Sequence, residues 1–194
     1  GDEFDAENYN IFIGEDAGGG AINGADKCVA IGKSALDAAI TQDGTIAIGH
    51  DALTSLTSGN LNTAIGFQAL DAVTTGNHNT AVGYLAGSAV GTDKTGTTAI
   101  GSKSLHQNNP GATTDYSVAV GTESGENQLT GYNNTFLGGN TNGNDSSAIN
   151  QTVIGYNATG VEDNSVTLGN SSVNYVYASS DQQGIFAGAG LQFP

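Results

Sequence analysis

Residues 62–70 read NTAIGFQAL, and residues 79–87 read NTAVGYLAG. Both stretches begin with a five-residue unit that ends in glycine, and this unit occurs ten times between residues 10 and 169. Successive closing glycines are 14 to 20 residues apart, so the chain is built from internal repeats, and repeats of this kind decide the architecture. The closing glycines are Gly14, Gly32, Gly49, Gly66, Gly83, Gly101, Gly121, Gly138, Gly155 and Gly169.

Each unit has the alternation of a short β-strand. The residue before the closing glycine is Ile, Val or Leu in every copy, and the residue two places earlier is Ile, Val or Thr. These two residues lie on one face of a strand, whereas the residue between them, Ala in six copies, lies on the other. We expect the flanking residues to point inward and the small alanine to face a closely approaching surface. Residues before the glycine include Ile31, Ile48, Ile65, Val82, Ile100 and Val120.

The remainder of each repeat predicts a closed coil. The glycine supplies a turn that a Cβ would oppose. Three residues later comes Ala, Ser or Thr, often followed by Leu as in Leu53 and Leu70, and this pattern predicts a second short strand. The rest is polar and carries the length variation, as loops do. One coil per repeat predicts an all-β fold, a parallel β-solenoid of about ten coils and roughly 50 Å in length.

The repeats divide the chain into three parts. Residues 10–173 form the solenoid domain, and the acidic residues 1–9 are expected to be a lead-in or cap. Residues 174–194 break the repeat, are rich in aromatic side chains and are expected to form a C-terminal cap or a junction.

Composition and charge exclude several classes of protein. The 194 residues contain 4 lysines, no arginine and 19 acids, which gives a net charge of −15. A nucleic-acid partner is excluded because it requires clustered basic side chains. Direct membrane insertion is excluded because no stretch approaches 18 apolar residues.

A coil of about 17 residues has a thin core, and we therefore expect burial against other chains. A parallel homotrimer would cover the outer face of the strand. The partner expected from the sequence is thus the chain itself.

The repeat unit resembles the head repeat of YadA-like trimeric autotransporter adhesins. It is also similar to repeats in phage tail-fibre and tailspike proteins, and residues 62–70 and 79–87 carry the likeness most closely. The resemblance covers residues 10–173 and implies a parallel trimer of left-handed β-rolls that projects from a surface and binds host or matrix molecules. The usual repeat of that family is near the 14 residues between Gly155 and Gly169, so the spacings of 17 to 20 residues here imply larger side loops.

Candidate ligand-binding residues are aromatic side chains predicted to lie in side loops. Exposed aromatic rings dominate recognition surfaces, although packing against the next coil is an equally good interpretation. A column of threonines that includes Thr63 and Thr80 would suit ice binding, but we expect that column to point inward. The candidate ligand-binding residues are Phe67, Tyr84, Tyr116 and Tyr132.

Metal and redox sites have weaker signals. The loop at residues 138–145 faintly resembles a calcium-binding repeat but occurs once, so we predict no cofactor, with calcium as the alternative. His50, His78 and His106 fall in different repeat columns and are not expected to form one ladder. Cys28 is expected to be a free thiol, with an intermolecular bond as the alternative.

These observations predict a non-enzymatic, extracellular fibre module on a virion tail or a bacterial surface. It would attach to a host glycan or a protein receptor. No catalytic set of side chains can be assigned. The alternatives are a purely structural shaft, a self-assembling filament, an ice-binding surface and a glycan-cleaving tailspike.

Overall fold

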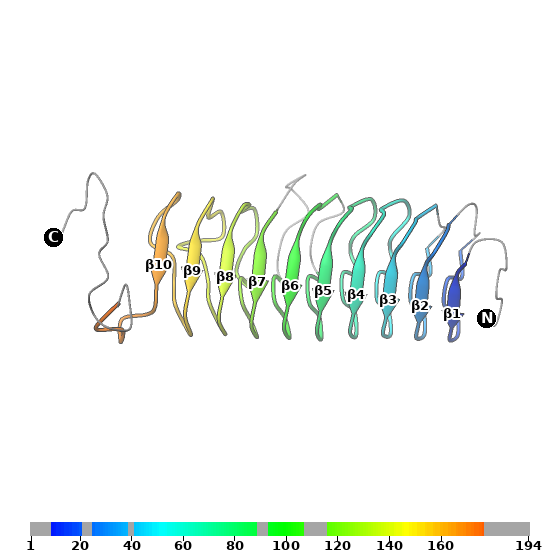
Figure 1. The fold of residues 1–194 in the computed structure, drawn as a ribbon, viewed down its shortest axis with the longest axis horizontal. Helices are drawn as coiled ribbons and strands as arrows, with labels where there is room; N and C mark the ends of the chain where they lie inside the picture. Colours follow the sequence, from blue (N-terminus) through cyan, green and yellow to red (C-terminus); the bar gives the residue numbers. More distant parts are fainter. Residues whose placement is uncertain (1–8, 21–24, 39–40, 89–92, 107–115, 177–194) are drawn as a thin grey trace.

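The repeats form a single parallel sheet. A computed structural model describes residues 9–20, 25–38, 41–88, 93–106 and 116–176. Ten three-residue strands pair in chain order, one from each repeat, and the described residues contain no helix (Figure 1). This confirms the predicted all-β solenoid. The strands are β1 (Ile11–Ile13), β2 (Val29–Ile31), β3 (Ile46–Ile48), β4 (Thr63–Ile65), β5 (Thr80–Val82), β6 (Thr98–Ile100), β7 (Val118–Val120), β8 (Thr135–Leu137), β9 (Thr152–Ile154) and β10 (Val166–Leu168).

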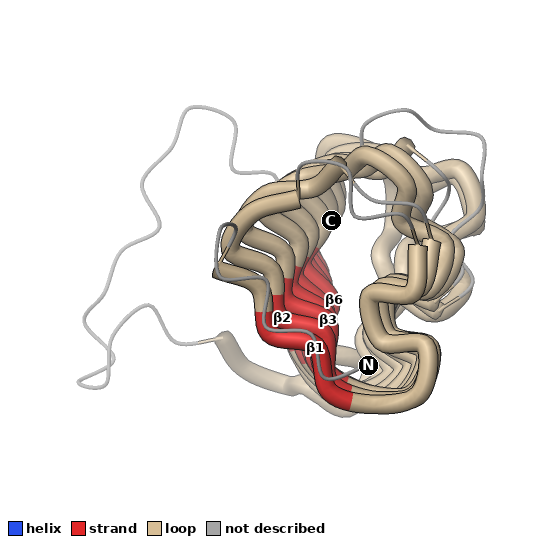
Figure 2. The backbone as a smooth tube through the Cα atoms, turned by 90° about the vertical axis from the view of Figure 1, so that its right-hand side faces the viewer, coloured by secondary structure: helices blue, strands red, loops and turns tan. Residues whose placement is uncertain are grey.

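The register between coils is constant. In β4 and β5, Thr63 pairs with Thr80, Ala64 with Ala81, and Ile65 with Val82, and every other pair of neighbouring strands follows this pattern. Because the register does not slip, residues added to a longer repeat leave the coil sideways. Seen end-on, the strands stack behind one another on one side of the coil, and turns and loops complete its outline (Figure 2).

The middle residue of each strand lies inside the coil, so our expectation about the two faces was wrong. The six alanines at this position are fully buried, whereas the residues on either side of them are half-buried or exposed. The interior is filled from the opposite turn by leucines such as Leu53 and Leu70, which are also fully buried. A narrow coil that already holds a leucine has room for only a methyl group on the strand. The buried alanines are Ala30, Ala47, Ala64, Ala81, Ala99 and Ala119.

The segment after each closing glycine is a turn, which corrects the predicted second strand. Gln68 and Leu70 both have φ of 51°, in the left-handed region, and alternate with Ala69. Strands require extended dihedral angles throughout, so this alternation turns the chain instead. Hydrogen bonds between coils continue through the turn, for example from the Leu53 amide to the Ala69 carbonyl at 3.0 Å.

The closing glycine is required by the stacking of coils as well as by the turn. Gly66 has φ of +141°, and a Cβ built on it would lie 2.2 Å from the carbonyl oxygen of Gly83 in the next coil. The first nine closing glycines share φ values between 126° and 141°. The backbones approach so closely in this column that no side chain fits.

Buried amides and small polar groups hold the start of each strand. The Asn79 side chain donates to the Lys94 carbonyl at 2.7 Å, and its oxygen accepts from the Thr97 amide at 2.9 Å. Cys28 occupies the same column as a fully buried free thiol, whose sulfur lies 3.2 Å from the Gln42 carbonyl. A thiol in this position cannot reach another chain, which supports the free-thiol interpretation.

The predicted terminal segments fall largely outside the described residues. Of the lead-in at 1–9 the structure describes Tyr9, and of the C-terminal part at 174–194 it describes residues 174–176.

Candidate functional site

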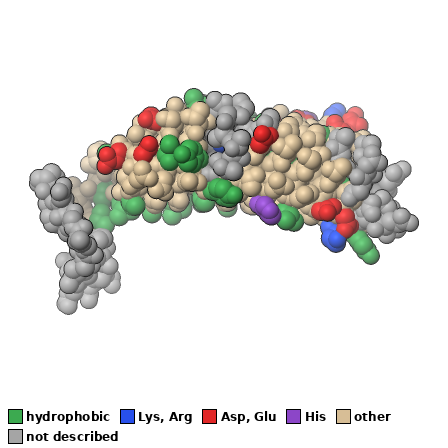
Figure 3. Space-filling model, turned by 90° about the horizontal axis from the view of Figure 1, so that it is seen from above, with side chains coloured by type: hydrophobic (Ala, Val, Ile, Leu, Met, Phe, Trp, Pro, Cys, Tyr) green, Lys and Arg blue, Asp and Glu red, His purple; other side chains and the backbone are tan. Residues whose placement is uncertain are grey.

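The outer face of the sheet is an apolar ribbon along the whole solenoid. Side chains on either side of each middle residue point away from the coil, with Ile65 37%, Leu168 43% and Val166 66% exposed. Hydrophobic side chains follow one edge of the rod (Figure 3). The column before the closing glycine consists of Ile13, Ile31, Ile48, Ile65, Val82, Ile100, Val120, Leu137, Ile154 and Leu168.

The threonine column belongs to this outer ribbon, which corrects the expectation that it points inward. Threonine occupies the first position of five strands, and these side chains are half-buried rather than enclosed. Alternation divides strand residues into two faces, and the structure places the threonines with the isoleucines on the outside. The five residues are Thr63, Thr80, Thr98, Thr135 and Thr152.

A stack of three rings lies at the turn that follows the strands. His50 and Phe67 have ring centroids 5.4 Å apart and planes at 19°, and Phe67 and Tyr84 are 5.6 Å apart at 22°. Each ring belongs to the residue directly after a closing glycine, so the register places the three above one another in β3, β4 and β5 coils. Phe67 and Tyr84 remain substantially exposed. His50 was not among the predicted ligand-binding residues, although its place directly after Gly49 puts it in the same column as Phe67 and Tyr84.

Tyr116 and Tyr132 lie apart from the stack. Both precede their strands, so they lie at the opposite end of the strands from the residues that follow the closing glycines. A Cβ on Gly96 would lie 2.5 Å from a ring carbon of Tyr116, so this ring packs over the preceding coil. Tyr132 forms an isolated parallel bridge with Ile149 of the following coil. The four predicted aromatic residues therefore do not form one site.

The histidines occupy three different environments. The Nδ1 of His50 lies 2.9 Å from the carboxylate of Asp51, and the Nδ1 of His106 lies 2.5 Å from the hydroxyl of Ser88. His78 precedes β5, in a column distant from both. Among the described residues, no three His, Cys, Asp or Glu side chains are grouped to hold a metal ion.

In the loop at 138–145, the carboxylate of Asp145 forms hydrogen bonds within its own turn. The Asp145 carboxylate accepts hydrogen bonds from the Ser147 amide at 2.7 Å and from the Ser147 hydroxyl at 2.8 Å, and these bonds lower its pKa.

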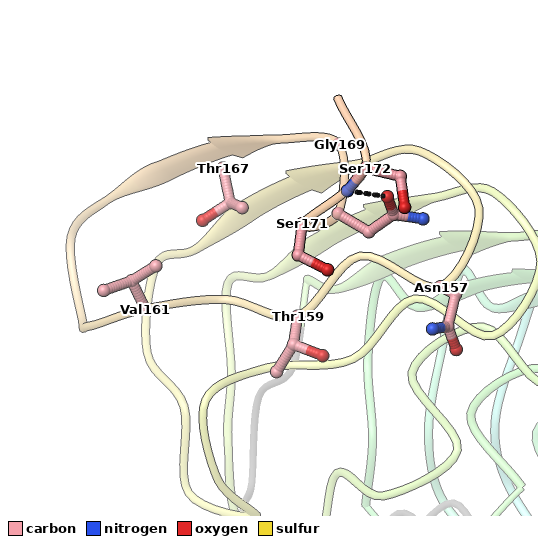
Figure 4. A pocket seen from close by; sticks show the side chains of 8 residues that line it. Asn157, Thr159, Val161, Thr167, Gly169, Ser171 and Ser172 are labelled. Carbon is pink, nitrogen blue, oxygen red and sulfur yellow. Dashed lines mark hydrogen bonds between the residues drawn. The ribbon is translucent and has the colours of Figure 1, made fainter. Parts of the chain in front are cut away.

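A polar cavity of about 610 Å³ lies at the C-terminal end of the described solenoid (Figure 4). Thr167, the middle residue of β10, contributes to its wall, and in the turn that lines it the Ser172 amide donates to the side-chain oxygen of Asn170 at 2.9 Å. Hydroxyl and amide groups dominate the lining, which suits hydrogen bonding to a polar molecule. None of these side chains is an acid, a base or an activated nucleophile. The lining residues are Asn157, Thr159, Val161, Thr167, Gly169, Asn170, Ser171 and Ser172.

Asp71 is the side chain whose protonation the fold changes most clearly among the described residues. Burial raises its pKa to about 6, and one carboxylate oxygen is enclosed without a hydrogen-bond donor. It lies in the turn directly after the core leucine Leu70.

Comparison with known proteins identifies no relative. No family model, no curated protein and no solved structure matches this chain. None of the described segments is a helix long and apolar enough to cross a bilayer.

Proposed function

We propose that this chain is a non-enzymatic module of an extracellular fibre, which attaches a virion tail or a bacterial surface to a receptor on a host. Ten stacked strands, one from each repeat, make a rod, and the nine steps between them correspond to about 43 Å. A rod with sideways loops suits a projecting spacer that presents contacts along its flank. The net charge of −15 on each chain favours a solvated rod that resists non-specific association.

The apolar ribbon is the observation that carries the proposed assembly. Isolated apolar side chains on a surface are ordinary, but a continuous ribbon over ten strands is typical of an interface. Because the ribbon runs along the rod, a partner with the same repeat covers it best when the two axes are parallel. A closed ring of three chains leaves no copy of the ribbon unpaired, and the resemblance to adhesin heads favours three.

Receptor contacts in this proposal come from aromatic side chains outside the ribbon. Phe67 and Tyr84 lie on the turn, and their exposed rings suit a glycan or a protein surface.

Sedimentation tests the assembly. The wild-type chain is expected to sediment at three times its 19.4 kDa mass. The variant Ile65→Glu/Val82→Glu places two charges in the ribbon and is expected to yield monomers or aggregates. Ser58→Glu adds a charge at an exposed loop position and serves as the control. A stable wild-type monomer would overturn the proposed trimer.

Attachment is tested separately with the assembled protein. Fluorescently labelled trimer is expected to bind to a panel of candidate host cells, and unlabelled trimer should compete for the same sites. Absence of binding across the panel, together with unchanged infectivity or adhesion when the side loops are deleted, would leave a purely structural shaft as the function.

Ice binding is a second candidate, favoured by the outward threonine column. Thr63, Thr80 and Thr98 are consecutive in this column, so the structure places three evenly spaced hydroxyls on a regular face. The column is interrupted by Val118, which breaks the array. Thermal hysteresis measured on the wild-type protein, and lost in Thr80→Asp, would support this candidate over attachment.

A further inference from the structure

We propose that the free ring face of Tyr84 binds a short neutral oligosaccharide through stacking against a sugar ring. This inference deepens the proposed attachment function and rests on it. It assigns a ligand class and a location to a contact that the proposed function leaves general.

The aromatic stack leaves one tyrosine face unused. Phe67 lies between His50 and Tyr84, so both faces of its ring are covered. Tyr84 ends the series, with one face on Phe67 and the other directed along the rod towards the next coil. The Lys103 amide donates to the Tyr84 carbonyl at 2.8 Å, which establishes that the β6 coil is the neighbour on that side. Tyr84 is nevertheless 51% exposed.

The next coil provides room beside that ring face. Ser102 occupies the position that Phe67 and Tyr84 hold in their own coils, and Thr122 and Gly139 follow it. The next ring in the column is Tyr156, four coils from Tyr84, or about 19 Å at the usual spacing of strands. An interval of this length between two exposed tyrosines accommodates two or three sugar units.

The chemistry favours a neutral sugar. One face of a hexose presents C–H groups that suit a ring face, while its hydroxyls need polar partners. The residues two places after the closing glycines form a neighbouring column. There the ammonium of Lys103, the carboxylate of Glu123 and the amide of Asn140 can form hydrogen bonds. A net charge of −15 per chain opposes sialylated glycans, nucleotides and other anions.

Substitution of Ser102 gives a sharp test. Ser102→Tyr extends the stack onto the free face of Tyr84 and thus fills the site, and it also removes the serine hydroxyl. Ser102→Ala is its matched control. The probes are neutral oligosaccharides of two to four hexose or N-acetylhexosamine units, screened on an array and then titrated by calorimetry against the intact assembled protein.

The expected result is binding of a neutral oligosaccharide that falls at least tenfold in Ser102→Tyr and in Tyr84→Leu. Ser102→Ala and Tyr84→Phe should retain it, since the first keeps the space and the second keeps the ring. Circular dichroism and sedimentation of each variant establish that the assembly is intact.

Three outcomes would overturn the inference. The first is that no neutral oligosaccharide binds at millimolar concentration. The second is that binding is equal in Ser102→Tyr and the wild type. Attachment to cells that persists in Ser102→Tyr would refute this site while leaving the proposed function standing. If the wild-type chain neither forms a trimer nor attaches to host cells, the proposed function itself is refuted.

Discussion

The ring of Phe136 lies over Gly125, where a Cβ would come within 2.8 Å of a ring carbon. Phe136 is the middle residue of β8, at a position where six other strands have Ala. Gly125 belongs to the preceding coil, and its column holds Leu in four other coils. At this point the large side chain on the strand occupies the interior space that a leucine on the turn fills in other coils, and the turn residue that faces it is a glycine.

This arrangement predicts that the two positions are coupled. Phe136→Ala alone leaves a cavity and should cost about 3–5 kcal/mol of unfolding free energy. Adding Gly125→Leu should recover part of that loss, because Leu70 and Leu105 already adopt the left-handed conformation found at Gly125. The new Cβ would also lie 2.7 Å from Cδ2 of Leu105, the end of a flexible side chain that can shift into the space left by Phe136. Urea unfolding at one fixed protein concentration measures both variants.

Gly125→Leu in the wild-type background is the control, since it forces a side chain into the Phe136 ring and should destabilise the protein. Strictly additive effects of the two substitutions would contradict this coupling.

Gly66→Ala should destabilise the rod strongly. The new Cβ meets the Gly83 carbonyl at 2.2 Å, and alanine is strained at φ of +141°. We expect a loss of more than about 3 kcal/mol in thermal or urea unfolding. Gly139→Ala is the matched control because its Cβ would lie an ordinary 3.6 Å from the Tyr156 ring, and it should change stability by about 0.5 kcal/mol or less. Equal losses in both variants would be inconsistent with the close approach of the coils at Gly66.

Asp71 should make the protein less stable as the pH rises through 6. Its pKa in the fold is about 6, above its ordinary value of 3.8, so the folded state favours the protonated form. The stabilisation is complete below pH 3.8 and is lost as the carboxyl ionises near pH 6. Asp71→Asn should therefore gain on the order of 1 kcal/mol relative to wild type at pH 7.5, after allowance for partial exposure, and little at pH 3.5.

Asp145 should change the pH dependence of stability in the direction opposite to Asp71. Hydrogen bonds from Ser147 lower its pKa, so its contribution to stability is present at neutral pH and decreases as the pH falls. A wild-type stability profile between pH 4 and 7 that Asp71→Asn leaves unchanged would show that Asp71 is not the group responsible.

Cys28 should react with a thiol reagent only after unfolding. It is fully buried, and burial raises the pKa of its thiol, so both access and the thiolate fraction are low at pH 8. We expect the reaction with a disulfide reagent to be at least tenfold slower in buffer than in denaturant. A covalent dimer on a non-reducing gel of freshly purified protein would contradict this expectation.

The spacing of the ten glycine-terminated units was sufficient to predict a parallel solenoid, one coil per repeat, and the place of each closing glycine. These features depend on residues that recur at a constant offset, and stacking in register is the arrangement that lets equivalent residues meet. The pairing of Thr63 with Thr80 and of Ile65 with Val82 follows directly from aligned sequence.

Which face of each strand is inside could not be read from that alignment. Alternation separates Ala64 from Thr63 and Ile65 but is symmetric between inside and outside. The volume inside the closed coil decides which face is buried. The buried Leu70 leaves space for only a methyl group opposite, so Ala64 points inward. The turn after Gly66 was mistaken for a strand for a related reason, since its left-handed residues at Gln68 and Leu70 carry no glycine to signal them.

The order of residues alone was enough to predict the repeat, the strand positions, the glycine column and the acidic charge, since each of these is a property of the sequence. The folded coil was needed to show that the isoleucine and threonine columns form the outer ribbon, and that His50, Phe67 and Tyr84 stack while Tyr116 lies elsewhere. Those relationships depend on how the coil closes and on distances between coils, which pack residues 17 positions apart within one another's reach.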